Sequence, residues 1–161
     1  GQRRYRQEMV TVMGDIRTVM TNVVTLQESL SITAPISSSI LRAYKYMPPM
    51  ASALPDTPCF LNNWTLQNQE LDIGLRILFY TVRMQLVVLD ADQDQAADIA
   101  SSYMNALITA QNADVQLGGS CNLTALRGGN PTLAVLNWAG IDYIGLDLFL
   151  DVEIKDAVSI S

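Results

Sequence analysis

The chain has 161 residues, which suits one domain with its own core; 49% are hydrophobic, only 16% are charged, and the formal net charge is −6. This balance argues against nucleic acid as the main partner, because phosphate binding needs clustered Lys and Arg, and no apolar run is long enough to span a membrane. Soluble proteins average about 25% charged residues, so the excess apolar surface is expected to meet other protein, as in an oligomer.

Residues 3–30 predict a helix of about seven turns. A coiled-coil seam with a partner helix would show this spacing. Met13, Met20 and Val24 widen the apolar stripe, however, which favours a single helix lying on a sheet. The stripe recurs at intervals of four and three: Tyr5, Met9, Val12, Ile16, Val19, Val23, Leu26 and Leu30.

Residues 31–58 are rich in Ser and Pro and predict a loop region, with a short extended piece over residues 40–46 and a long irregular loop over residues 47–58. Loops of this length in a compact domain are usually functional or disordered, and this one is too apolar for simple disorder. We expect it to pack on the domain itself or on a neighbouring subunit. Its candidate interface residues are Tyr44, Tyr46, Met47, Met50 and Leu54.

A short strand is expected over residues 59–66, followed by a polar turn over residues 67–74. The next element is a long strand over residues 75–88, because alternate positions are apolar, the period of a strand with one buried face. Those positions are Leu78, Tyr80, Val82, Met84, Leu86 and Val88.

Asp90 and Asp92 end this strand, and Asp92 with Gln95 fits a capping box for a helix. The helix has one apolar stripe, which would pack against the preceding strand. The stripe consists of Ala96, Ile99, Ala100, Tyr103, Leu107 and Ala110. After it we expect a turn over residues 112–120, strands over residues 121–126 and 133–138, and a turn between those strands at residues 127–131.

The last strand has the clearest alternation. Leu146, Leu148, Leu150, Val152 and Ile154 share one face, and Asp147, Asp151, Glu153 and Lys155 share the other. A slip of one residue would bury four charges, so the register is firmly set. Phe149 is the single apolar residue on the charged face; isolated exposed aromatics are common, but it is also a candidate anchor for a partner.

These elements predict an α+β fold: a mostly antiparallel sheet with a long N-terminal helix and a second helix packed on one face. We expect a single domain over residues 1–161, made of an N-terminal helix (1–30), a Pro/Ser-rich loop region (31–58), and a sheet plus helix (59–161).

The residue types needed for most catalysis are missing. There is no histidine, which excludes Ser-His-Asp and Cys-His catalysis and makes a zinc site close to impossible. Cys59 and Cys121 could form one disulfide, but we expect two separate buried thiols.

Other ligand motifs also fail. Asp90, Asp92 and Asp94 begin like a calcium loop, yet Gln95 and Ser101 occupy the positions where that loop needs Gly and Glu. The Gly118-Gly119 and Gly128-Gly129 pairs do not match the phosphate-binding templates. We therefore expect no enzyme, no metal and no cofactor.

Several stretches of the second half resemble the tail terminator (tail completion) proteins of long-tailed bacteriophages. They are Tyr80-Thr81-Val82-Arg83-Met84-Gln85-Leu86, Ala96-Ala97-Asp98-Ile99-Ala100, Leu126-Arg127-Gly128-Gly129, Tyr143-Ile144-Gly145-Leu146-Asp147-Leu148 and Val152-Glu153-Ile154. The resemblance is one of element order over residues 3–158.

The resemblance implies a structural virion protein of the tail-neck region, assembled in the host cytoplasm. It implies a homohexameric ring that caps the tail tube and joins it to the head connector. Its partners would be further copies of itself, the tail tube protein and a connector or neck protein. Two alternatives stay open: another phage neck or tail-joining protein, and a small-ligand-binding α+β regulatory domain with a pocket between sheet and helices.

Overall fold

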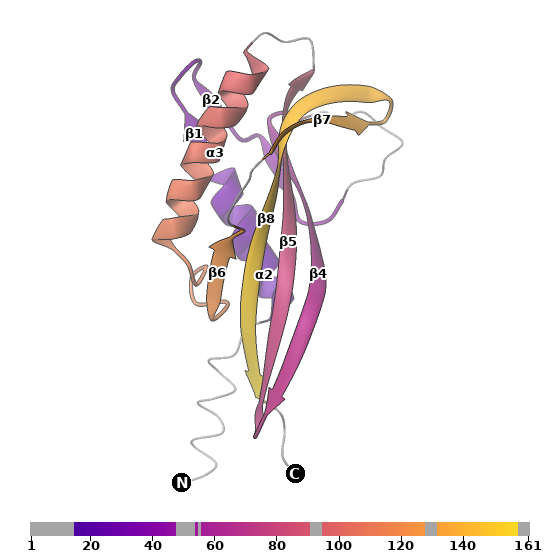
Figure 1. Ribbon diagram of the computed structural model, residues 1–161. Coiled ribbons are helices and arrows are strands. Elements are labelled where there is room, and N and C mark those ends of the chain that lie inside the picture. The colour runs from indigo at the N-terminus through magenta and orange to yellow at the C-terminus, as the bar shows by residue number, and fades with distance from the viewer. Residues whose placement is uncertain (1–14, 48–53, 55, 91–94, 128–131, 158–161) are drawn as a thin grey trace.

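The computed structural model describes residues 15–47, 54, 56–90, 95–127 and 132–157. They form an α+β fold with a mostly antiparallel sheet and two helices on one side of it (Figure 1). The elements in chain order are α2 (Ile16–Glu28), β1 (Ser31–Ile32), β2 (Ser38–Ser39), β3 (Arg42–Tyr44), β4 (Cys59–Asp72), β5 (Leu75–Asp90), α3 (Ala96–Ala113), β6 (Leu123–Leu126), β7 (Thr132–Trp138) and β8 (Ile141–Ala157).

The main sheet has the order β3-β4-β5-β8-β6, and β7 also pairs with β8, beyond the segment that β6 covers. β3 runs parallel to β4, and every other described pair in this sheet is antiparallel. β1 and β2 form a separate two-residue ladder. The fold class expected from the sequence is confirmed.

The centre of the sheet is the β5–β8 pair, and its register is the predicted one. Directly opposite residues share a face of a sheet, and Val82 opposes Leu150 while Met84 opposes Leu148. All four are at most 2% exposed and belong to the core beneath the helices. The apolar alternation predicted for the two long strands therefore faces α2 and α3.

The predicted helix over residues 3–30 is not continuous. Asp15 is extended (φ −135°, ψ 137°) and caps α2, its carboxylate accepting a hydrogen bond from the Arg17 amide at 2.9 Å. This bond is the largest cause of a lowered pKa of Asp15. An Asp favours a helix N-cap over a helix interior, so the helix begins at Ile16; residues 1–14 lie outside the described residues.

The start of α3 also differs from the prediction. The N-cap is Gln95, whose side chain makes no capping bond, while Asp92 lies outside the described residues. The predicted stripe is otherwise confirmed, since Ile99, Ala100 and Tyr103 are buried. Gln111, rather than Ala110, is the last buried position of this stripe.

β4 extends beyond its predicted end. The polar turn expected over residues 67–74 is wrong: the strand continues to Asp72, and the turn is reduced to Ile73 and Gly74. The strand is irregular between Leu66 and Asn68, where the register with β5 shifts by one residue. Residues 63–72 are exposed, so this half of β4 is held mainly by its backbone pairing with β5, together with the edge-to-face contact of Trp64 with Tyr80 at 5.5 Å.

The loop region contains more structure than the sequence indicated. The extended piece expected over residues 40–46 contains β3, but the β1–β2 ladder was not predicted. Leu54 packs with Cys59, Leu61, Val87, Trp138 and Tyr143 in a second, smaller cluster. Because Leu61 and Val87 alternate with the residues facing the helices, this second cluster covers one end of the opposite face of the sheet.

A buried pair of amides joins α2 to the sheet. Gln27 Nε2 donates to Asn62 Oδ1 and Asn62 Nδ2 donates to Gln27 Oε1, both at 2.8 Å, and Asn62 Nδ2 also donates to the Tyr44 carbonyl. Both side chains are fully buried. Since buried polar groups are costly without partners, this pair aligns α2, β3 and β4 in a single arrangement.

Replacing one member of this pair should therefore destabilise the protein. We predict that Gln27→Leu lowers the free energy of unfolding by about 1–3 kcal/mol, because Asn62 Oδ1 loses its donor. The double variant Gln27→Leu/Asn62→Leu should be less destabilised than the sum of its single variants, as measured by urea denaturation. Additive losses would show that the amides do not interact.

Gly145 allows β5 and β8 to approach closely at the irregularity of the ladder. A Cβ at this position would lie 2.0 Å from the Leu86 carbonyl oxygen and 2.8 Å from Leu136 Cδ1. We predict that Gly145→Ala costs about 3 kcal/mol of stability through overpacking. Gly140→Ala is the matched control, because it meets open space at φ +78° and should cost only about 1 kcal/mol of backbone strain. Equal costs in thermal unfolding would contradict the close approach.

Candidate interaction surface

The face of the sheet opposite the helices, here called the open face, carries the charged residues of β8. Phe149 lies among them, opposite Arg83 of β5. It is half-buried, and its ring contacts two guanidinium groups, with the Arg83 and Arg127 Cζ atoms 5.9 and 5.2 Å from the ring centroid. The predicted exposed aromatic is thus flanked by cations at cation–π distance.

Each of these arginines is held by an aspartate. Arg83 donates to both carboxylate oxygens of Asp147, at 2.8 and 2.7 Å, and this hydrogen bonding raises the pKa of Arg83. Arg127 Nη2 donates to Asp151 Oδ1 at 2.9 Å. Exposed ion pairs stabilise a fold little, so their effect here is to orient two planar guanidinium groups beside Phe149.

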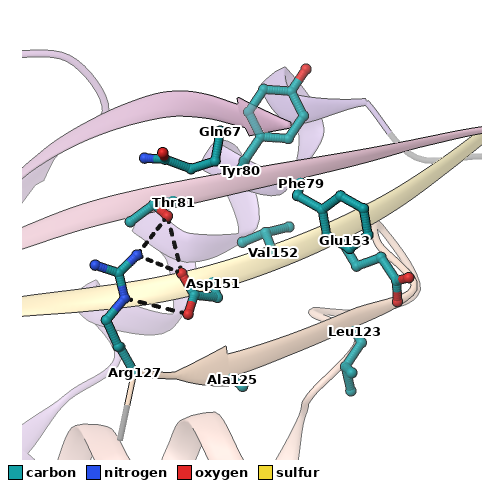
Figure 2. Close-up of a pocket in the computed structure, with 10 residues that line it drawn as sticks. All are labelled: Gln67, Phe79, Tyr80, Thr81, Leu123, Ala125, Arg127, Asp151, Val152 and Glu153. Carbon is teal, nitrogen blue, oxygen red and sulfur yellow. Dashed lines mark hydrogen bonds and ion pairs between the residues drawn. The ribbon is translucent and has the colours of Figure 1, made fainter. Parts of the chain in front are cut away.

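Thr81 completes this group. Its hydroxyl donates to Asp151 Oδ1 at 3.0 Å and accepts from Arg127 Nη2 at 2.9 Å, as the dashed lines of Figure 2 show. We call these six residues the Phe149 cluster: Thr81, Arg83, Arg127, Asp147, Phe149 and Asp151. It offers an aromatic ring and two arginines, residue types enriched at the centres of protein interfaces.

A groove of about 630 Å³ runs beside the Phe149 cluster, between β4 and β6 (Figure 2). Phe79, Leu123 and Ala125 give it an apolar lining, while Arg127 and Asp151 stand at one end. At the other end Glu153 accepts a hydrogen bond from Asn122 Nδ2 at 2.6 Å. The carboxylates lining the groove are thus engaged with arginine or amide partners.

The second exposed feature is a projection of the sheet, here called the arm: residues 66–78 of β4 and β5 with residues 154–157 of β8. Figure 1 shows these three strands running past α2 to a narrow tip. Apolar side chains are exposed along it, with Leu66 at 45%, Leu71 at 70% and Ile73, in the tip turn, at 95%. Exposed apolar surface is rare on monomers and often marks a site of interaction with another protein.

The candidate loop residues lie elsewhere. Leu54 is buried in the second cluster, its amide donating to the Tyr143 hydroxyl at 3.4 Å. Tyr44 is half-buried against that cluster, and Tyr46 (59%) and Met47 (41%) are exposed. Met50 lies outside the described residues.

The structure therefore leaves Tyr46 and Met47 as accessible members of the predicted loop interface. Met47 lines a hollow of about 290 Å³ with Gln85, Val135 and Leu136. The hollow lies next to the Phe149 cluster, because Gln85 is directly opposite Asp147 in the β5–β8 ladder.

Reactive groups are scarce in the part of the chain that the structure describes. No group of three His, Cys, Asp or Glu residues that could hold a metal ion is found there. Cys59 and Cys121 are free and buried, and burial raises the pKa of Cys59 to about 12 and that of Cys121 to about 11, so neither thiol is activated as a nucleophile.

No helix among the described residues combines the length and hydropathy needed to cross a membrane. The chain matches no protein-family model, no curated protein and no solved structure.

The arm is the feature that sequence reasoning missed. Its strand residues Gln67, Asn68 and Gln69 are all polar and do not alternate with apolar residues, a pattern that is typical of a turn. A better signal was the length of the following strand, which needs a partner of similar length, together with the Ile73-Gly74 pair suited to a tight turn.

The Phe149 cluster generates a direct prediction. Phe149→Asp should leave the monomer folded, with a change in unfolding free energy of about 1 kcal/mol, because the residue lies outside the core. The same change should weaken self-association measured by sedimentation velocity, and Phe149→Tyr, which retains the ring, should preserve it. An unfolded Phe149→Asp protein would show that Phe149 belongs to the core.

Proposed function

We propose that this protein is a structural component that joins copies of itself and neighbouring proteins by surface complementarity, without chemical turnover. The observation that carries the proposal is the arm, whose tip exposes Leu71 and Ile73 at the end of a three-stranded ladder. A monomer gains nothing from presenting these side chains to water, whereas burial between subunits stabilises an assembly.

The resemblance of the sequence to phage tail terminator proteins gives this proposal its specific form. In that form the chain closes into a hexameric ring, caps a tail tube and offers its other face to a head connector or another neck protein. A ring needs two different patches on each subunit that fit one another. The arm offers surface for such contacts between copies, and the Phe149 cluster is a further exposed patch on a separate part of the sheet.

A second candidate function rests on the groove beside the Phe149 cluster, whose volume of about 630 Å³ suits a small ligand. A regulatory domain of this kind would remain a monomer and would gain thermal stability when a small molecule is added. The proposed ring protein differs in both respects, so the native mass and a thermal-shift screen separate the two functions.

The arm variants test the structural proposal. We predict that Leu71→Asp/Ile73→Asp weakens assembly at least tenfold, because two exposed apolar contacts are replaced by charge. The wild type should form closed rings visible by negative-stain electron microscopy at high concentration. Asn68→Asp/Gln69→Asp is the matched control, since it adds the same charge to β4 at two exposed polar positions. Equal association of all three proteins would show that the arm is not an assembly surface.

A further inference from the structure

Among the described residues, the outer edge of β4 is unpaired along the arm. β3 pairs with β4 only from Cys59 to Leu61, so among the described residues no strand pairs with the outer side of residues 62–72. Open edges present free N–H and C=O groups, and natural proteins usually protect them with Lys, Pro or a bulge. This edge has a bulge next to Leu66 but neither Lys nor Pro.

A second open edge lies on the opposite side of the arm. The pairing of β6 with β8 ends at Leu123 and Glu153, so residues 154–157 of β8 have no described partner on that side. The register places the two edges at the same level. Glu70 opposes Ile77, which opposes Lys155, and the ladder continues in step to the tip at Asp72 and Ala157.

Building on the proposed self-assembly, we propose that copies of this chain join through these two edges, residues 70–72 of β4 in one copy pairing with residues 155–157 of β8 in the next. β4 and β8 are each antiparallel to β5, so they run in the same direction. A neighbour related by rotation about a ring axis keeps that direction, and the new pairing is parallel. The contact is heterologous, as ring closure requires.

Charge complementarity supports a second copy as the occupant. Glu70 and Lys155 share one face of the arm, because both are in register with Ile77. Neither side chain makes an ion pair within the described part of the chain. Edge-to-edge joining brings Glu70 of one copy beside Lys155 of the next, so that each acquires an opposite charge.

The same pairing also gives the exposed Leu71, at the tip of the arm, a contact with the next copy. Leu71 lies on the other face, 70% exposed, level with the ion pair that Arg76 makes with Asp156. In the joined arms Leu71 would cover the aliphatic part of that pair. A two-fold contact centred on the β4 tip would instead bring the acidic Glu70 and Asp72 of two copies together, which is unfavourable.

Disulfide trapping tests the pairing directly. Cys variants at positions 70 and 155 cannot bond within one chain, because β5 lies between them and two strand spacings of about 4.8 Å exceed the reach of a disulfide. We expect a mixture of Glu70→Cys and Lys155→Cys proteins to form a covalent dimer on mild oxidation. The double variant should form a series of larger covalent oligomers. Each single variant alone is the control, since Cys59 and Cys121 are buried.

Charge reversal gives an independent readout. Glu70→Lys and Lys155→Glu should each weaken association about tenfold or more by like-charge contact, and the double variant should recover most of it. Asp98→Lys makes the same charge change on an exposed position of α3 and should have little effect. The two single variants shift the net charge in opposite directions, so weakening by both, with recovery in the double variant, is the result that a general effect of net charge would not produce.

The outcomes separate this inference from the proposed function. If wild-type rings form but Glu70→Cys cross-links with itself, or no 70–155 cross-link appears, the arm pairing is wrong and ring assembly stands. If the wild type remains a monomer at every concentration and no cross-link forms, both proposals fail.

Discussion

The structure depends on the β5–β8 ladder. Its pairs extend from Leu75 and Ala157 at the tip to Asp90 and Tyr143 at the other end. One alternation sends apolar residues under the helices, and the other sends charged residues to the open face. Because each side-chain set is committed to one face, no slip of register is tolerated, and the position of the Phe149 cluster follows from the packing of the core.

The ladder is longer than the helices that cover it, and this mismatch creates the arm. Where α2 and α3 overlie the sheet, side chains such as Val82 and Leu150 are fully buried. Beyond α2 the same strands continue, joined by the ladders on the two sides of β5, and Leu71 and Ile73 reach solvent. The fold thus separates a body packed under the helices from a projecting three-stranded arm.

The sequence predicted those parts of the fold in which alternation reports burial. β5, α3 and β8 follow their apolar positions closely, and so does the fold class. The prediction from the sequence failed where burial does not decide the conformation. The exposed half of β4 is a strand because β5 pairs with it. Asp15 caps α2, so this helix begins at Ile16, a start that the apolar seam across Asp15 did not reveal.

The candidate sites follow the same rule. Phe149 was identifiable because it interrupts a charged face, but its two arginine neighbours come from β5 and from the residue after β6, which only the pairing of those strands with β8 reveals. Leu54 has the same apolar character as Met47, yet it is buried in the chain's own second cluster. Composition alone does not distinguish a loop residue that packs inward from one that faces a partner.

The central claim is that the protein functions by joining copies through its arm. Hydrogen–deuterium exchange measured over a range of protein concentrations tests this most directly, because the amides on the outer edge of β4 have no described partner in the single chain. We expect exchange in residues 70–72 to slow as the concentration rises, while α3 is unchanged. Exchange in the arm that stays fast at every concentration, under conditions where assemblies form, would contradict the claim.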